Sequence, residues 1–537
     1  MTTNYKQILL ILFKLISLPG IISLLFLSAP VTATPINTKT IAQQPQNTDI
    51  KAAADKVFAE GVELFNQRTA DSLKQAIPKF QAAAQLYEQA RKINLQAICL
   101  VVIGNVYSDI GEKQKALVFY NQALPISRML GDKKMEATTL NNIGTVYRFL
   151  LEKQKALDFF NQALPILRML GDKRMEATTL NNIGSVYNFL EKPDKALELF
   201  NQALPIFRAF RDKSMEATTL NNIGSAYKSL GKYQRALEFF NQALSIFRVV
   251  EDKSKEATIL NNIGTIHNSL GEKQQALEYY NQALSLYKAL GNRDREANTL
   301  GNIGTIYNSL GEKQQALESF NQALPIFQEL GDRHREAIIL NNIGVVYSDL
   351  EEKQKALSYY NQALPLYKAL GDRDGEAITL NNIGNIYDDL EEKQKALSYY
   401  NQALPLYQAL GDRDEEANTL NNIGSVYDSL GEKQKALEYY NQALPLYKAL
   451  GDRDGEVTTL NNIGNVYYSL GEKLKALSYY NQASPPYKAL PTRLPERLPV
   501  NFRTQESFFP IFREEDIFLP VFRKPTRLPL RLPKSTR

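Results

Sequence analysis

Apolar and polar residues along this chain follow one pattern that returns every 40 residues. The segment Leu-Asn-Asn-Ile-Gly begins at positions 140, 180, 220, 260, 340, 380, 420 and 460, and Leu-Gly-Asn-Ile-Gly begins at 300. In the first half of the repeat, Leu140, Ile143 and Tyr147 fall on one arc of a helix that turns by about 100° per residue. Gly144 lies on the same arc and opens a notch where another helix can approach closely. The first half of each repeat therefore predicts an amphipathic helix.

The second half of each repeat predicts a second helix. Leu157, Phe160 and Leu164 form an apolar stripe, in which the small residues Ala156 and Ala163 alternate with the large ones. A proline recurs inside this helix at 125, 165, 205, 325, 365, 405 and 445, and we expect it to bend the helix. The period therefore holds two antiparallel helices.

Residues that end and begin helices separate these segments. Gly171 stands where a helix end favours a left-handed conformation, and Asp172 follows at the N-cap of the next helix. Gly271, Gly311 and Gly431 mark a shorter turn inside the repeat. The chain therefore predicts an uninterrupted array of helix pairs.

The recurring Leu, Gly, Tyr and Ala positions closely resemble the pattern of the tetratricopeptide repeat. The resemblance covers residues 54–490, and the 40-residue form is similar to the repeats of kinesin light chains and of secreted cyanobacterial repeat proteins. It implies an all-α fold, a right-handed superhelical solenoid of antiparallel helix pairs. It also implies a non-catalytic scaffold that binds an extended peptide or a partner's loop in its concave groove.

The repeats divide the chain into predicted segments. Residues 51–91 form a divergent first repeat, 97–456 form nine repeats of 40 residues, and 457–490 form the last one. Before them come a predicted signal peptide at 1–33 and a flexible leader at 34–50. After them comes a Pro/Arg-rich tail at 491–537, which is expected to be disordered.

The N-terminal segment has the layout of a secretory signal. Lys6 and Lys14 precede an apolar run at 15–29, which is short for a bilayer span of about 20 residues. Ala33 and Ala42 end candidate cleavage sites. We expect an exported protein, periplasmic or extracellular, and membrane attachment only if the segment stays uncleaved.

Charge and composition argue against several classes of function. The net charge is +5, but the tail at 491–537 carries all of the excess, and the rest of the chain has 53 basic and 53 acidic residues. This balance of charge disfavours a groove that binds nucleic acid, because such a groove needs an excess of basic residues. One cysteine, Cys99, and two histidines, His267 and His334, give little material for a metal site or a catalytic triad. We therefore expect no enzyme, metal, cofactor or small-molecule substrate.

One column of asparagines is the first candidate for peptide binding. An amide side chain carries both a donor and an acceptor, so it can hold a peptide group without reading its side chain. The helix geometry points residues equivalent to Thr138, Asn141, Thr145 and Arg148 into the groove. The asparagine column consists of Asn141, Asn181, Asn221, Asn261, Asn341, Asn381, Asn421 and Asn461. These amides can equally bond the adjacent repeat, as we expect for the neighbouring column that begins at Asn142.

The next groove position varies in charge and is a candidate for specificity. Its basic members are Arg148 and Lys228, and its acidic members are Asp388 and Asp428. Asp349 and Asp389 follow in the adjacent column, so the stretch from 348 to 428 is expected to be acidic. A solvated polar face is an equal interpretation.

Two further interpretations stay open from the sequence alone. The array resembles the regulatory region of caspase-like protease systems, whose catalytic domain would be lost or encoded separately, and a long array can also assemble with itself as a structural protein. The basic tail could dock intramolecularly on the acidic repeats. Arg503, Arg513 and Arg523 recur in it every ten residues.

Overall fold

The computed structural model describes residues 44–483, which form helices joined by short turns and contain no strand. The first helices of the pairs are α2 (Gln44–Asn66), α4 (Ile93–Asp109), α6 (Lys133–Phe149), α8 (Lys173–Phe189), α10 (Lys213–Ser229), α12 (Lys253–Ser269), α14 (Arg293–Ser309), α16 (Arg333–Asp349), α18 (Arg373–Asp389), α20 (Arg413–Ser429) and α22 (Arg453–Ser469). The second helices are α3 (Ala70–Gln89), α5 (Lys113–Met129), α7 (Lys153–Leu170), α9 (Pro193–Ala209), α11 (Tyr233–Val249), α13 (Lys273–Ala289), α15 (Lys313–Leu330), α17 (Lys353–Leu370), α19 (Lys393–Leu410), α21 (Lys433–Leu450) and α23 (Lys473–Ala483).

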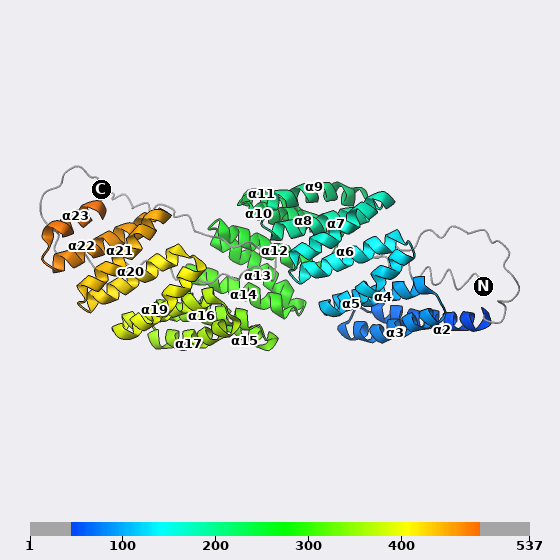
Figure 1. Cartoon of the computed structure of the whole chain (residues 1–537), viewed down its shortest axis with the longest axis horizontal. Coiled ribbons are helices and arrows are strands. Elements are labelled where there is room, and N and C mark those ends of the chain that lie inside the picture. The colour runs from blue at the N-terminus through cyan, green and yellow to red at the C-terminus, as the bar shows by residue number, and fades with distance from the viewer. Residues whose placement is uncertain (1–43, 484–537) are drawn as a thin grey trace. The chain divides into compact units, whose positions relative to one another are not determined.

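The helices stack as an all-α solenoid, as the sequence predicts. Each first helix packs on the second helix of its own pair, and first helices of adjacent pairs also touch, as α6 and α8 do (Figure 1). The chain divides into two compact units, with the boundary after Ile266. None of the helices between residues 44 and 483 is long and apolar enough to span a bilayer.

Several predicted segments lie outside the described residues. These are the signal peptide at 1–33, most of the leader at 34–50, the end of the last repeat and the tail at 491–537 with its proposed docking. The leader prediction differs from the structure at its end, because α2 already begins at Gln44. Pro45 occupies the second position of this helix, where its missing amide hydrogen costs nothing, so it is compatible with an early start.

The predicted helix ends are confirmed. Gly171 takes the left-handed conformation, with φ 66°, at the C-terminus of α7. The Asp172 side chain accepts a hydrogen bond of 3.1 Å from the backbone N–H of Met175 and caps α8. The second helices run through their internal prolines, as α7 does at Pro165. Local residue chemistry thus sets the length of each element.

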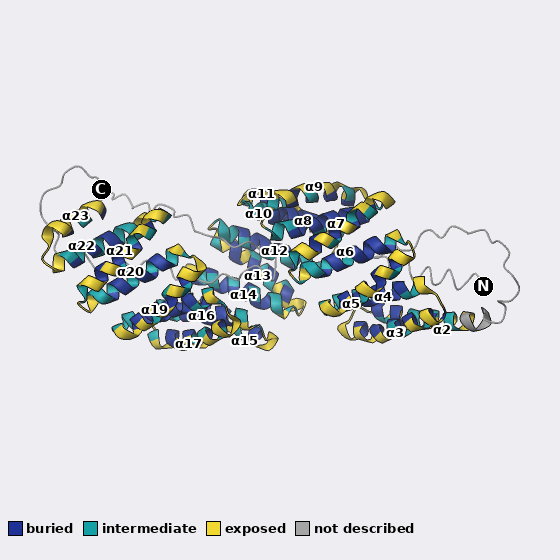
Figure 2. Cartoon of the chain, in the orientation of Figure 1, coloured by how far each residue is buried: buried dark blue, intermediate teal, exposed yellow. Residues whose placement is uncertain are grey.

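The core of most repeats depends on a glycine that faces an aromatic ring. A Cβ at Gly144 would lie 2.7 Å from Cδ1 of Phe160, and a Cβ at Gly344 would lie 2.5 Å from Cε1 of Tyr360. The same contact recurs at Gly104, Gly184, Gly224, Gly304, Gly384, Gly424 and Gly464. Figure 2 shows the result as buried stripes where helices face their neighbours, with exposed residues near the helix ends. The notch that the sequence predicts at this glycine is therefore real.

A buried glutamate joins consecutive repeats, a feature that the sequence analysis missed. Glu136 on α6 accepts from Arg128 Nε of α5 at 2.9 Å and from Lys133 Nζ at 2.8 Å. Burial alone would raise the pKa of Glu136, but these two cations outweigh it and hold the pKa below its ordinary value. The arrangement recurs at Glu176, Glu216 and Glu256. It ties the end of one pair to the start of the next.

We predict that Gly144→Ala destabilises the protein. Alanine favours a helix by about 1 kcal/mol over glycine, but its methyl would overlap the Phe160 ring, and such overpacking typically costs about 1–3 kcal/mol. Urea unfolding followed by circular dichroism measures the change. The control is the same substitution in a Phe160→Leu background, where the smaller side chain makes room and the penalty should shrink. An equal penalty in both backgrounds would show that the ring is not its cause.

Candidate functional site

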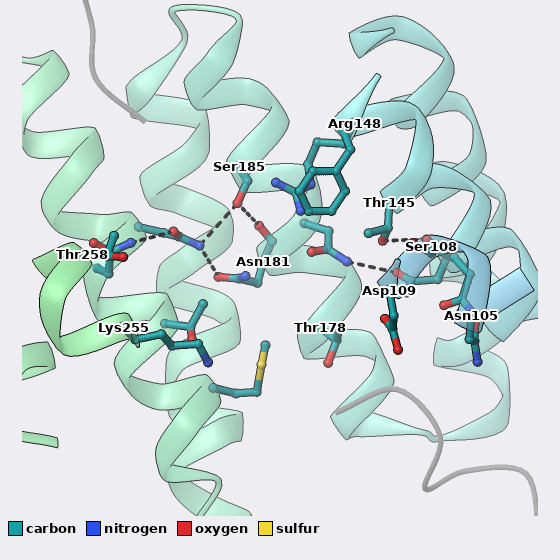
Figure 3. Close-up of a pocket in the computed structure, with 18 of the residues that line it drawn as sticks. Asn105, Ser108, Asp109, Thr145, Arg148, Thr178, Asn181, Ser185, Lys255 and Thr258 are labelled. Carbon is teal, nitrogen blue, oxygen red and sulfur yellow. Dashed lines mark hydrogen bonds between the residues drawn. The ribbon is translucent and has the colours of Figure 1, made fainter. Parts of the chain in front are cut away.

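A cavity of about 490 Å³ lies in the N-terminal unit, along the first helices of five consecutive pairs. Its wall comes mainly from α4, α6, α8, α10 and α12. Most of the lining side chains are polar and uncharged, among them Asn105, Thr145, Thr178, Asn181, Ser185 and Thr258 (Figure 3). Thr218 also lines the cavity. The cavity is therefore an open trough lined mainly by polar residues, although the surface that they expose to it is largely apolar.

All four columns that the sequence directs into the groove contribute to this wall. The column of Thr138 contributes Thr178, Thr218 and Thr258, and the column of Thr145 contributes Asn105, Thr145 and Ser185. The asparagine column contributes Asn141, Asn181 and Asn221, and the fourth column contributes Ser108 and Arg148. Helix periodicity thus predicts which face of the first helices is concave.

The two asparagine columns form one hydrogen-bonded ladder between repeats. Asn182 Nδ2 donates to Asn141 Oδ1 at 3.3 Å, and Asn222 Nδ2 donates to Asn181 Oδ1 at 3.2 Å. The step repeats from Asn262 to Asn221, from Asn382 to Asn341 and from Asn462 to Asn421. Threonines join it, since Thr179 donates to Asn141 Oδ1 at 3.1 Å.

This ladder changes the expectation for the first asparagine column. In six of its members the side-chain oxygen accepts a bond from the following repeat, so it does not face the open side as the sequence predicts. These members are Asn141, Asn181, Asn221, Asn341, Asn381 and Asn421. Asn341 is fully buried, and Asn141 and Asn181 are each 4% exposed. The reason is the close packing of successive first helices, which turns this position partly toward the next helix. Peptide binding by this column stays a prediction, with the acceptor already engaged at the ladder positions.

The ladder is interrupted at Asn342. Where it is interrupted at Val101, Asn142 bonds Asn105 instead, and Asn422 bonds Asn385. The second column of the ladder places Asn342 opposite residue 301, where glycine replaces asparagine. Both polar side-chain atoms of Asn342 are buried, and no described residue bonds them. A buried amide without a partner typically costs about 1–3 kcal/mol. Gly301 therefore leaves a weak junction between α14 and α16.

Arg148 differs from the rest of the wall because it carries an unbalanced charge. Its Nε is buried, and none of the described residues forms a hydrogen bond with its guanidinium (Figure 3). Burial lowers the pKa of Arg148 to about 10, so the group is still charged at neutral pH. The guanidinium carbon lies 4.5 Å from the centre of the Phe149 ring.

A few charged groups lie near Arg148. Asp109 forms a long ion pair with Arg68, with 3.4 Å between Oδ2 and Nη1. Burial raises the pKa of Asp109, although Arg68 and Lys113 oppose it. Lys113 Nζ donates to the carbonyl oxygen of Ser108 at 2.7 Å, and burial lowers its pKa, with Arg148 adding to the effect. Cations therefore outnumber carboxylates at this end of the trough.

A family model of the tetratricopeptide repeat matches overlapping pairs of units from 135–209 through 415–488. These matches cover more than half of the chain. The chain belongs to the tetratricopeptide repeat family. Proteins of this fold are typically non-catalytic interaction scaffolds, and the repeats support that general role here.

Several solved structures are similar to this tetratricopeptide repeat chain. The apo form of the quorum sensor NprR from B. thuringiensis has 18% identity over 67% of this chain and 99% of its own, with a TM-score of 0.47. A Rap protein complexed with competence and sporulation factor has 16% identity over 67% and 99%, with a TM-score of 0.43. Apo RapI has 19% identity over 50% and 96%, with a TM-score of 0.41. No curated protein matches the chain.

The structure places Asp349, Asp388 and Asp428 of the later repeats in ion pairs. Asp388 accepts from Lys393 Nζ at 2.8 Å, and Asp428 accepts from Lys433 Nζ at 2.6 Å. Asp349 pairs with Lys313, and the backbone carbonyl of Asp389 accepts from Lys353 at 3.0 Å. The acidic stretch is thus more neutral than expected, because a lysine at the start of a second helix pairs with the carboxylates of Asp349, Asp388 and Asp428. Lys228 is only 1% exposed and makes interactions within the array.

Some lining residues were not foreseen. Phe65 and Arg68 come from the divergent first repeat, where no period marks them, and Phe247 comes from a second helix. Met215 and Lys255 share a column that begins at Met135, and this could have been found by extending the helical arc by one position. His267 stacks on Tyr279 with ring centres 5.2 Å apart, and His334 is 41% exposed. Between residues 44 and 483, no cluster of His, Cys, Asp or Glu is arranged to hold a metal ion.

We predict that Gly301→Asn stabilises this tetratricopeptide repeat array. The new side chain restores an acceptor for Asn342, and the change also removes a glycine from a helix, so we expect a gain of about 1–3 kcal/mol. Gly301→Ala is the matched control, since it changes helix propensity without supplying an acceptor. Thermal and urea unfolding of both variants measure the difference. If alanine stabilises as much as asparagine, the ladder bond contributes nothing at this step.

Proposed function

We propose that the trough of the N-terminal unit binds an extended peptide of a partner protein. The carrying observation is the open cavity, lined mainly by polar residues, that runs across five consecutive first helices. Adjacent packed helices lie roughly 10 Å apart, so four intervals span about 40 Å. An extended chain covers about 3.3 Å per residue, and the trough therefore accommodates about twelve residues.

The chemistry of the wall suits a main chain better than a particular side chain. Hydroxyl groups of Thr178, Thr218 and Thr258 and amide groups of the asparagine column repeat at each step along the trough. The hydroxyls of Thr178, Thr218 and Thr258 donate to backbone carbonyls one turn earlier, so toward the trough they offer acceptors. Asn141 and Asn181 retain Nδ2 donors, since the ladder uses their oxygens. Each such bond contributes about 0.5–1.5 kcal/mol net, so affinity would come from many modest contacts.

Selection from a randomised library of twelve-residue peptides tests this function. We expect the full chain to retain a defined set of peptides, and Thr145→Trp to abolish their binding, since the indole would fill the trough. Asn161→Trp on α7 is the matched control, because Asn161 is exposed on a second helix and does not line the cavity. Fluorescence anisotropy measures the affinities. Equal binding by both tryptophan variants, or no retained peptides, would contradict the proposal.

We also propose that this scaffold works outside the cytoplasm. The supporting feature is the basic and then apolar N-terminal segment, which lies outside the described residues. Cleavage after Ala33 or Ala42 is expected when the chain is expressed in a bacterium. Mass spectrometry of the mature N-terminus checks it, and a protein that keeps residues 1–33 in the cytoplasmic fraction would contradict export.

A further inference from the structure

The free protein holds a positive charge in the trough that its own residues do not neutralise. Arg148 has a buried Nε, and its guanidinium forms no bond with any described residue. Removing an ion from water is costly unless an opposite charge or hydrogen bonds replace the solvent. In this protein, Arg148 is therefore already desolvated in part before any ligand arrives.

An aromatic ring fixes the position of this charge. The Arg148 guanidinium and Lys113 Nζ each lie 4.5 Å from the centre of the Phe149 ring. Phe149 itself is 54% exposed, so it supports the two cations without covering them. Attraction between a cation and a ring restricts the arginine side chain. Binding of a ligand therefore costs little further side-chain entropy at Arg148.

The surrounding groups leave this site positive. The charged side chains that line the cavity are Arg68, Asp109, Arg148 and Lys255, of which only Asp109 is acidic. Asp109 forms its ion pair with Arg68, with 3.4 Å between Oδ2 and Nη1. Lys113 adds a further positive charge behind Phe149. The wall therefore favours an anion at Arg148.

We propose that Arg148 binds a carboxylate side chain of an acidic peptide in the trough and thereby sets a preference for Asp or Glu at one ligand position. The inference rests on the proposed function, since it names the chemistry of the peptide that this trough holds. A guanidinium presents parallel N–H donors that match the two oxygens of a carboxylate. The hydroxyl and amide wall on either side would hold the main chain of the same peptide.

The column in which Arg148 stands explains why this preference would be local. Equivalent positions in neighbouring repeats are Ser108 and Asn188, which carry no charge. Lys228 is the other cation of this column, and it is buried and engaged within the array. The repeat that contains Arg148 would thus select an acidic residue of the peptide, while the repeats beside it would accept a wider range of side chains.

The experiment uses the tightest peptide from the library selection and its copies with each Asp or Glu changed to Asn or Gln. We expect the selected peptides to share an acidic position and its amide copy to bind about tenfold to a hundredfold more weakly. Arg148→Met should weaken the acidic peptide by a similar factor and remove its advantage over the amide copy. Methionine keeps an unbranched stem beside Phe149, and circular dichroism checks that the helices persist. The advantage should also shrink with added salt.

Lys195→Met is the matched control, because Lys195 is exposed on α9, outside the cavity, and its loss changes the net charge equally. Equal weakening by Arg148→Met and Lys195→Met would overturn the inference, since it would reflect general charge. Selected peptides without an acidic position would also overturn it while leaving peptide binding intact. A selection that retains no peptide overturns the proposed function and this inference together.

Discussion

The contact between a glycine on the first helix and an aromatic ring on the second sets the geometry on which the rest of this protein depends. At Gly144 the ring of Phe160 occupies the space of the missing side chain. This close approach fixes the separation within each pair, and repetition every 40 residues carries the same separation along each unit. Successive first helices then lie near enough for Asn182 to reach Asn141. The trough exists because these helices stay in register.

The features that the sequence predicted well depend on single residues and their immediate neighbours. Gly171 ends a helix and Asp172 caps the next one for reasons that lie within a few residues. The columns of Thr145 and Arg148 face the cavity because helix periodicity alone decides the face. Repetition made these patterns unusually clear, since each was present many times.

The features that the sequence predicted poorly depend on distances between repeats. The oxygen of Asn141 is engaged because a helix 38 to 41 residues later comes within bonding range. Asp388 is neutralised by Lys393, whose long side chain reaches back across a turn. Nothing in the spacing of charges shows whether such a chain folds back or extends. The sequence likewise does not show that Arg148 lacks a hydrogen-bond partner, because this depends on which side chains of other repeats lie beside it.

The interrupted ladder at Gly301 has a mechanical consequence. In a solenoid each repeat is held only by its neighbours, so the array resists extension no better than its weakest junction. Between α14 and α16, the amide of Asn342 lacks the partner that its counterparts have. When the protein is pulled from its ends, this junction is the natural place for the first rupture. The unpaired amide of Asn342 opposite Gly301 thereby gives the array a defined breaking point.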